Sequence, residues 1–151
     1  MRVVIQRVKQ ARVLIDSSTF SSIGNGLLVL LGVEGEDMEE DVSWLSVKVA
    51  NLRIIGDAGG KMNRSIKETG GEVLVVSQFT LFADTKKGNR PSFTRSAKRE
   101  KANFFYEMFN KLLSEELGRN VQTGKFGAMM EIELINDGPV TIILDSRRKE
   151  I

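Results

Sequence analysis

The chain has 151 residues, of which 41% are hydrophobic and 28% charged, and its formal net charge is +2. This length and composition are ordinary for one globular domain that buries a hydrophobic core. The chain contains no histidine and no cysteine. Their absence excludes disulfide scaffolds, thiol nucleophiles, Ser-His-Asp triads, zinc fingers and histidine-bearing metal sites. An enzyme of this composition has to work with hydroxyl, carboxylate, basic and backbone groups, or with groups of its own substrate.

The first third of the sequence predicts mostly strands. Alternating or continuous apolar residues indicate strands over residues 2–8, 11–16, 20–23 and 27–33. Arg7 lies on the same face of the predicted strand as Val3 and Ile5, and this position leaves two interpretations of its guanidinium. It either points inward, where it needs carbonyl or carboxylate partners and would anchor a loop, or it extends from the strand end into solvent.

Two helices are predicted from apolar residues spaced three and four apart. The acidic run 34–41 favours a helix start, with Asp37 as the capping residue and Glu40 completing a capping box. The first helix continues to about residue 52. The second is expected over residues 96–117, where Gly118 would end it.

The remaining segments predict further strands and turns. We expect a buried strand at 72–76, a polar loop at 86–96, and two strands at 130–135 and 140–144 joined by a turn at 136–139. These elements indicate a single α/β domain over residues 1–151, with mixed sheets, two main helices and more strand than helix.

Charge and hydropathy limit where the protein acts. The longest apolar run, Leu27–Leu31, is far too short for a membrane helix, and basic residues interrupt the N-terminal segment, so we expect a soluble, cytoplasmic protein without membrane partners. Seven bases and one acid lie between Lys86 and Lys101. Such a segment suits phosphate binding, but a solvated helix start beside a mobile loop has the same composition.

Two polar motifs remain as candidates for chemistry. Residues Ser77 to Leu81 follow the buried strand directly, at a position where backbone N–H groups and hydroxyls are exposed to a substrate. The alternative is a strand end whose polar side chains cap their own backbone. The second motif, Asn136 to Thr141, contains a Gly-Pro step that is either a simple turn or a rigidly presented backbone feature.

Together these segments resemble the D-aminoacyl-tRNA deacylase family over nearly the whole chain. The most specific matches are the Ser77-Gln78-Phe79-Thr80-Leu81 motif and the Asn136-Asp137-Gly138-Pro139-Val140-Thr141 motif, neither of which departs from the family pattern. Further matching segments are residues 1–8, 26–33, 51–54, 60–63, 71–76, 87–93 and 123–128.

The resemblance implies a layered β/β/α homodimer that hydrolyses the ester of D-aminoacyl-tRNA and of glycyl-tRNA, spares L-aminoacyl-tRNA, and needs no metal or other cofactor. It implies that the aminoacylated 3′ end of tRNA is the partner, not DNA. Residues Ser77, Gln78, Phe79 and Thr80 would line the pocket. The Gly138-Pro139 step would be cis and would enter the partner subunit's pocket to reject L-side chains, with Arg7 and Met130 in supporting roles.

An aminoacyl ester is activated, and the ribose 2′-hydroxyl beside it can assist hydrolysis, so backbone N–H groups and positioning can suffice. A nucleophilic Thr80 is the alternative mechanism, although the sequence offers no histidine to activate it. Lys86, Lys87 and Arg90 are our candidates for binding the tRNA acceptor stem. Two other functions stay open: an editing hydrolase for other mischarged tRNAs, and a tRNA-end binding module without turnover.

Overall fold

The computed structural model describes residues 1–150 and is built on one mixed sheet of six strands. The central strand β1 pairs antiparallel with three others along its length, while β3, β6 and β7 continue the sheet in parallel. The six strands are β1 (Arg2–Ile15), β2 (Ser18–Ile23), β3 (Gly26–Gly32), β6 (Glu72–Ser77), β7 (Gln122–Thr123) and β8 (Glu131–Asp145).

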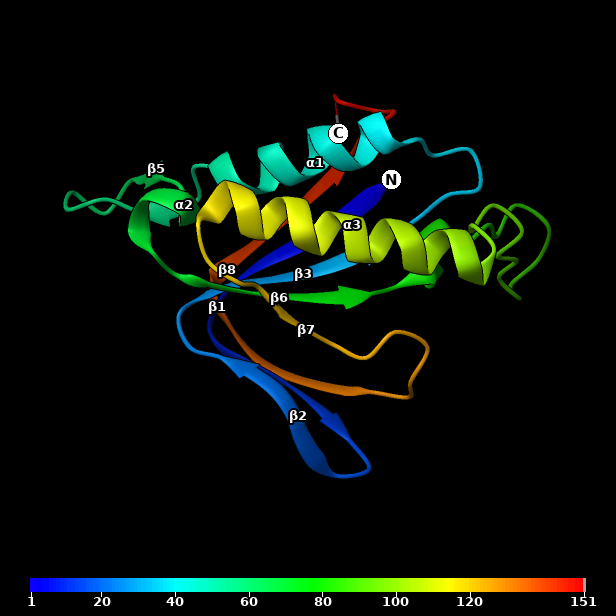
Figure 1. The fold of residues 1–151 in the computed structure, drawn as a ribbon, viewed down its shortest axis with the longest axis horizontal. Helices are drawn as coiled ribbons and strands as arrows, with labels where there is room; N and C mark the ends of the chain where they lie inside the picture. The colour runs from blue at the N-terminus through cyan, green and yellow to red at the C-terminus, as the bar shows by residue number, and fades with distance from the viewer. Residues whose placement is uncertain (151) are drawn as a thin grey trace.

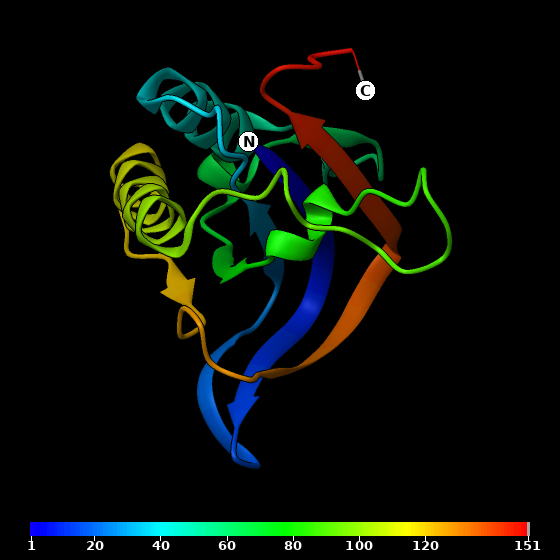
Figure 2. The same cartoon turned by 90° about the vertical axis from the view of Figure 1, so that its right-hand side faces the viewer.

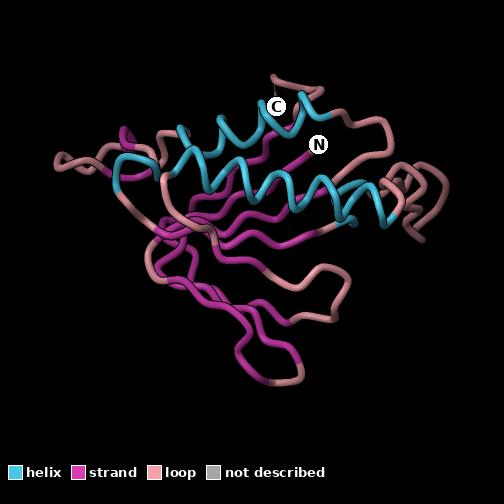
Figure 3. Tube along the Cα trace, in the orientation of Figure 1, coloured by secondary structure: helices cyan, strands magenta, loops and turns pink. Residues whose placement is uncertain are grey.

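Two long helices cover one face of this sheet, as Figures 1 and 3 show. The main core lies between helices and sheet, where Val29, Leu45 and Phe109 are fully buried. The helices are α1 (Glu39–Asn51), α2 (Ile66–Thr69) and α3 (Arg99–Leu117), with a 3₁₀ turn η1 (Phe79–Phe82) and a small hairpin of β4 (Ile55–Gly56) and β5 (Met62–Arg64). Within residues 1–150, no helix combines the length and the apolar character that crossing a membrane requires.

The opposite face of the sheet carries a smaller apolar cluster. Val13, Leu28 and Leu74 are buried there, but Ile132 and Leu134 of β8 are only partly covered. Figure 2, turned by 90°, shows both long helices together on one side of the molecule, with the hairpin of β1 and β2 at the opposite end. The α/β class with mixed strands and two main helices, predicted from the sequence, is therefore confirmed.

The structure corrects two predicted boundaries between strands. Residues 2–8 and 11–16 belong to one continuous strand, β1, and residues 130–135 and 140–144 belong to one continuous strand, β8. The predicted turn at 136–139 is instead a bulge, because the pairing with β1 shifts between Gln6–Thr141 and Val8–Asn136. Local sequence suggested a reversal there, whereas pairing with β1 on both sides keeps the chain extended.

The predicted cap of α1 is also wrong. Met38 is the capping residue, and the Asp41 carboxylate accepts a hydrogen bond from its N–H at 2.8 Å. Asp37 is fully buried and accepts from the terminal ammonium of Met1 at 2.5 Å and from the Glu34 N–H at 2.6 Å. The carboxylate expected to cap the helix therefore ties the start of β1 to the loop before α1. Gly118 does end α3, in the left-handed conformation.

Gly26 provides a direct test of the β3–β6 contact. A Cβ at Gly26 would lie 1.8 Å from the Glu72 carbonyl oxygen, whereas a Cβ at Gly24 would meet only a flexible side-chain oxygen at 3.4 Å. We predict that Gly26→Ala lowers the free energy of unfolding by at least about 2 kcal/mol, because the backbones of two paired strands have to separate. Chemical denaturation measures this, and Gly24→Ala is the matched control; equal stability of the two variants would contradict the prediction.

Candidate active site

The first predicted motif forms a tight turn at the end of β6. Ser77 pairs with Leu31 of β3, and the Gln78 N–H donates to the Leu31 carbonyl at 2.8 Å before the chain enters η1. Gly32 lies under this turn, because a Cβ there would lie 3.1 Å from the Gln78 carbonyl oxygen and from the Leu81 side chain. The turn therefore packs closely onto β3, and the side chains of Phe79 and Thr80 remain exposed.

Two backbone donors are free at this turn. Within residues 1–150, the N–H groups of Phe79 and Thr80 have no hydrogen-bond acceptor. They are the first N–H groups of η1, which lack partners inside the helix. Adjacent, unpaired N–H groups at an exposed turn are the arrangement that stabilises a developing oxyanion.

The polar side chains of the turn bond to one another. The amide of Gln78 donates from Nε2 to Oγ1 of Thr80 at 2.6 Å. An amide cannot accept a proton from a hydroxyl at neutral pH in either orientation. Within residues 1–150, no carboxylate or amine forms a hydrogen bond with the Thr80 hydroxyl.

The turn is also held from outside. Arg2 donates from Nη1 to the Leu81 carbonyl at 2.8 Å and from Nε and Nη2 to the Asp145 carboxylate at 3.0 and 2.9 Å. Burial alone would raise the pKa of Asp145, but hydrogen bonds from the Arg147 N–H and the Arg2 guanidinium outweigh it and keep that pKa below its ordinary value. The carboxylate is therefore charged at neutral pH, and it anchors Arg2 beneath the turn.

Two residues that the sequence analysis did not single out also touch Phe79. The rings of Phe79 and Phe93 pack edge to face with centroids 5.1 Å apart, and the Ser96 hydroxyl donates to the Phe79 carbonyl at 3.0 Å. Both residues lie where the basic loop returns to the fold. The sequence pointed to Phe93 only through the matching segment 87–93, and it did not point to Ser96.

The second motif is a rigid bulge of β8. Nε of Arg7 lies 3.1 Å from the Asp137 carbonyl and 3.2 Å from its carboxylate, and Nη1 donates to the Ile54 carbonyl at 2.7 Å. The inward interpretation of Arg7 is therefore correct: its side chain is only 17% exposed. The Asn136 side chain accepts from the Val140 N–H at 2.8 Å and so closes the bulge.

The bulge presents Gly138 and Pro139 to solvent. The peptide bond between them is cis, and Gly138 has a φ of 135°. A Cβ at Gly138 would lie 2.7 Å from Val140 Cγ2 and 2.9 Å from the Val140 nitrogen. Only glycine therefore fits the backbone at this position.

The two motifs lie far apart within one chain. Ser77 aligns with Leu144 of β8 through the pairing of β6, β3 and β1, whereas Gly138 precedes Leu144 by six residues, or about 20 Å of strand. Figure 1 shows the end of β6 and the middle of β8 at opposite ends of the sheet. The structure thus brings Ser77, Gln78, Phe79 and Thr80 together and leaves Gly138 and Pro139 remote from them.

The other predicted residues flank the turn. Met130 packs over the Gly124 backbone, beside the Val76 side chain that precedes the turn. Three exposed bases lie in the loop that leaves η1, and none of them forms an ion pair within residues 1–150. They are Lys86, Lys87 and Arg90.

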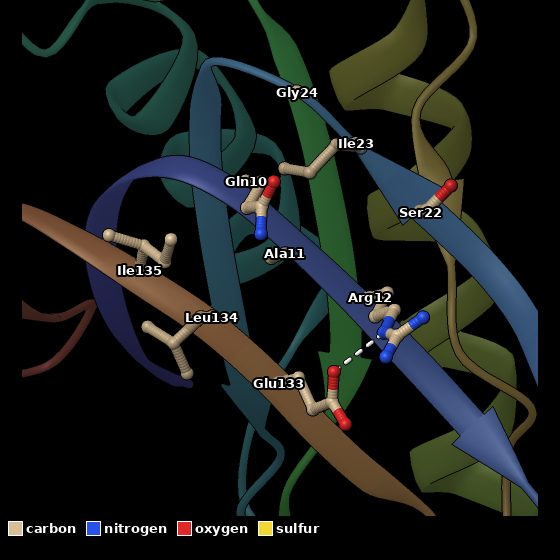
Figure 4. A pocket seen from close by; sticks show the side chains of 9 residues that line it. All are labelled: Gln10, Ala11, Arg12, Ser22, Ile23, Gly24, Glu133, Leu134 and Ile135. Atoms are coloured by element: carbon tan, nitrogen blue, oxygen red, sulfur yellow. Dashed lines mark hydrogen bonds and ion pairs between the residues drawn. The ribbon is translucent and has the colours of Figure 1, made fainter. Parts of the chain in front are cut away.

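A cavity of about 610 Å³ opens elsewhere, over β1, β2 and β8. Figure 4 shows its polar groups, of which Arg12 and Glu133 pair with each other across the two strands at 2.6 Å. None of the predicted site residues lines it. A second cavity, of about 380 Å³, lies behind the bulge and is lined by Arg7, Asp137 and several glycines. Within residues 1–150, no cluster of acidic side chains has the grouping needed to hold a metal ion.

Comparison with known proteins agrees with the family resemblance seen in the sequence. A family model described as D-Tyr-tRNA(Tyr) deacylase matches residues 4–145. The D-aminoacyl-tRNA deacylases of Chlorobaculum parvum and Parabacteroides distasonis are 58% and 57% identical to this chain, over 99% of it and all of their own length.

Two solved structures resemble the fold. The c-Myc DNA unwinding element binding protein is 40% identical, with a TM-score of 0.89 over 96% of this chain and 98% of that one. A probable eukaryotic D-amino acid tRNA deacylase is 17% identical, with a TM-score of 0.85 over 95% and 98%. At that identity the second similarity concerns the fold alone.

Proposed function

Because the chain belongs to the D-aminoacyl-tRNA deacylase family, we propose that it hydrolyses the ester between a D-amino acid and the 3′ adenosine of tRNA, and also the glycyl ester. The products are free tRNA and the free amino acid. The observation that carries this proposal is the pair of unpartnered N–H groups at Phe79 and Thr80, on an exposed turn at the end of a buried strand.

In the proposed mechanism, water attacks the ester carbonyl and the two N–H groups stabilise the oxyanion that develops. The ribose 2′-hydroxyl of the substrate assists, since it lies next to the ester and the chain has no histidine or cysteine. Gln78 orients the Thr80 hydroxyl, and Ser77 and Phe79 border the site. Thr80 acts here by position, because no group of the site accepts its proton.

We further propose that the enzyme is a homodimer in which Gly138 and Pro139 of one subunit enter the site of the other. The separation of the two motifs supports this arrangement, since the bulge cannot reach the turn of its own chain. The partly covered apolar residues of β8 offer a surface for a second copy. In such a pocket the bulge, held by Arg7, leaves room for a D-side chain or for glycine and excludes an L-side chain.

The three exposed bases of the loop after η1 are proposed to bind phosphates of the tRNA acceptor stem. The loop is anchored on both sides by backbone bonds between Asp84 and Ser92. It projects from the end of the sheet where the catalytic turn lies, so it can reach the nucleotides next to the aminoacylated end.

The primary test is release of amino acid from D-tyrosyl-tRNA and L-tyrosyl-tRNA at low enzyme concentration. We expect the D-ester to be hydrolysed at least about 100-fold faster, because the excluded side chain costs the L-ester a steric clash. Equal rates would favour an editing hydrolase for other mischarged tRNAs and would contradict the chiral filter. No hydrolysis, with tRNA still bound, would leave only a binding module.

The role of Thr80 is tested by Thr80→Ala. We predict a loss of about 10-fold or less in kcat, because the variant loses a positioning contact and keeps the backbone N–H groups. Thr80→Ser, which retains the hydroxyl, is the control. A loss of about 10⁴-fold with intact fold would indicate a nucleophilic hydroxyl and an acyl-enzyme, since removal of a covalent nucleophile has effects of that size.

The proposed tRNA contacts predict a change in salt dependence. Binding of tRNA weakens steeply with salt when phosphates are neutralised by basic side chains. Neutralising Lys86, Lys87 and Arg90 together to glutamine should flatten the plot of log affinity against log salt by about two units of slope. An unchanged slope would contradict the assignment. A matched control neutralises three bases outside this loop: Lys48, Lys111 and Arg148.

A further inference from the structure

We infer that Ser96 is a positioning residue for the oxyanion site, an inference that rests on the proposed hydrolysis. Its hydroxyl donates to the Phe79 carbonyl oxygen at 3.0 Å. That carbonyl belongs to the same peptide group as the Thr80 N–H, which is one of the two free donors of the turn. Ser96 thus acts on the donor through the peptide that carries it and does not itself touch the substrate.

The planarity of the peptide makes this coupling direct. The bond between Phe79 and Thr80 is trans, since the one cis bond within residues 1–150 lies at Gly138-Pro139. In a trans peptide the C=O and the N–H point in opposite directions within one rigid plane. A hydrogen bond that fixes the carbonyl therefore also fixes the direction of the N–H. It polarises the peptide as well, which strengthens the N–H as a donor.

The segment that carries Ser96 contacts the turn at two other residues, Phe79 and Phe82. The Phe93 ring packs edge to face on Phe79, and the Arg95 guanidinium lies over the Phe82 ring, 5.7 Å from its centroid. Arg95 is fixed in turn by an ion pair with Glu34 at 2.6 Å. Residues 93–96, which we call the loop root, thus contact the first and the last residue of η1.

The fixed position of the loop root supports a role for Ser96 beyond packing. The Ala97 N–H donates to the Val33 carbonyl at 2.9 Å, and the Arg95 carbonyl accepts from the Gly35 N–H at 2.9 Å. Ser96 lies between these two backbone anchors, so its hydroxyl reaches Phe79 from a rigid support. The same root carries the basic loop, which places the proposed tRNA contacts and the oxyanion peptide on one continuous segment.

The kinetic test compares Ser96→Ala with the wild type on D-tyrosyl-tRNA. We expect kcat to fall between about 10-fold and 100-fold with KM unchanged, because one misaligned oxyanion donor affects the transition state and not substrate binding. Ser96→Thr keeps the hydroxyl and should recover most of the loss. The matched control is Ser43→Ala, which removes a serine hydroxyl that also donates to a carbonyl at 3.0 Å but lies on α1.

A binding test separates positioning from general structure. Two probes are compared: an amide analogue of D-tyrosyl-adenosine, and a phosphonate analogue whose anionic tetrahedral centre imitates the intermediate. Ser96→Ala should weaken the phosphonate at least about 10-fold and leave the amide analogue within about twofold. Equal weakening of both probes, a loss confined to KM, or kcat within about twofold of wild type would overturn the inference.

A further measurement does not depend on turnover. The amide resonance of Thr80 should shift in the proton–nitrogen spectrum of Ser96→Ala and stay in place in Ser43→Ala. An unshifted resonance would overturn the positioning role. Failure of the wild type to release amino acid would instead count against the proposed function, so the two failures are distinguishable.

Discussion

The pairing of β1 with β8 determines most of what this molecule can do. The two strands run side by side from Arg2–Asp145 at one end to Leu14–Glu131 at the other, with register shifts at the bulge and directly after it, between Val8–Asn136 and Gln10–Ile135. Because the sheet is continuous, the bulge and the turn after β6 are held at a fixed separation. No local rearrangement brings them together, and a site that uses both has to combine two chains.

This constraint assigns separate tasks to the two motifs. The turn after β6 offers backbone hydrogen-bond donors at Phe79 and Thr80, which suits stabilisation of a developing charge. The bulge offers bulk and a fixed backbone, held by Arg7 and Asn136, which suits exclusion of a side chain. In the proposed dimer, catalysis and discrimination are therefore contributed by different subunits, and each pocket is complete only at the interface.

The sequence predicted those parts of the fold that local patterns determine. Apolar periodicity located β3, β6 and both long helices, and the polar motif directly after the buried strand located the turn after β6. Predictions from local sequence were wrong where contacts between distant residues determine the structure. Asp37 accepts a hydrogen bond from the terminal ammonium instead of capping α1. Residues 136–139 remain in strand because β8 pairs with β1 on both sides of them. The contact of Ser96 with Phe79 has no local pattern at all, since it joins a loop root to a turn.

Such contacts matter most in a site without ionisable catalytic groups. A backbone N–H carries no charge and cannot exchange its proton at the rate of catalysis, so in the proposed mechanism it acts only through its direction and distance. The rate then depends on how firmly the peptide is held, and the residues that hold it become as important as those that line the pocket. Ser96 and Phe93 contact Phe79 at the start of η1, and Arg2 bonds to the Leu81 carbonyl, so the turn is held by side chains distant from it in sequence.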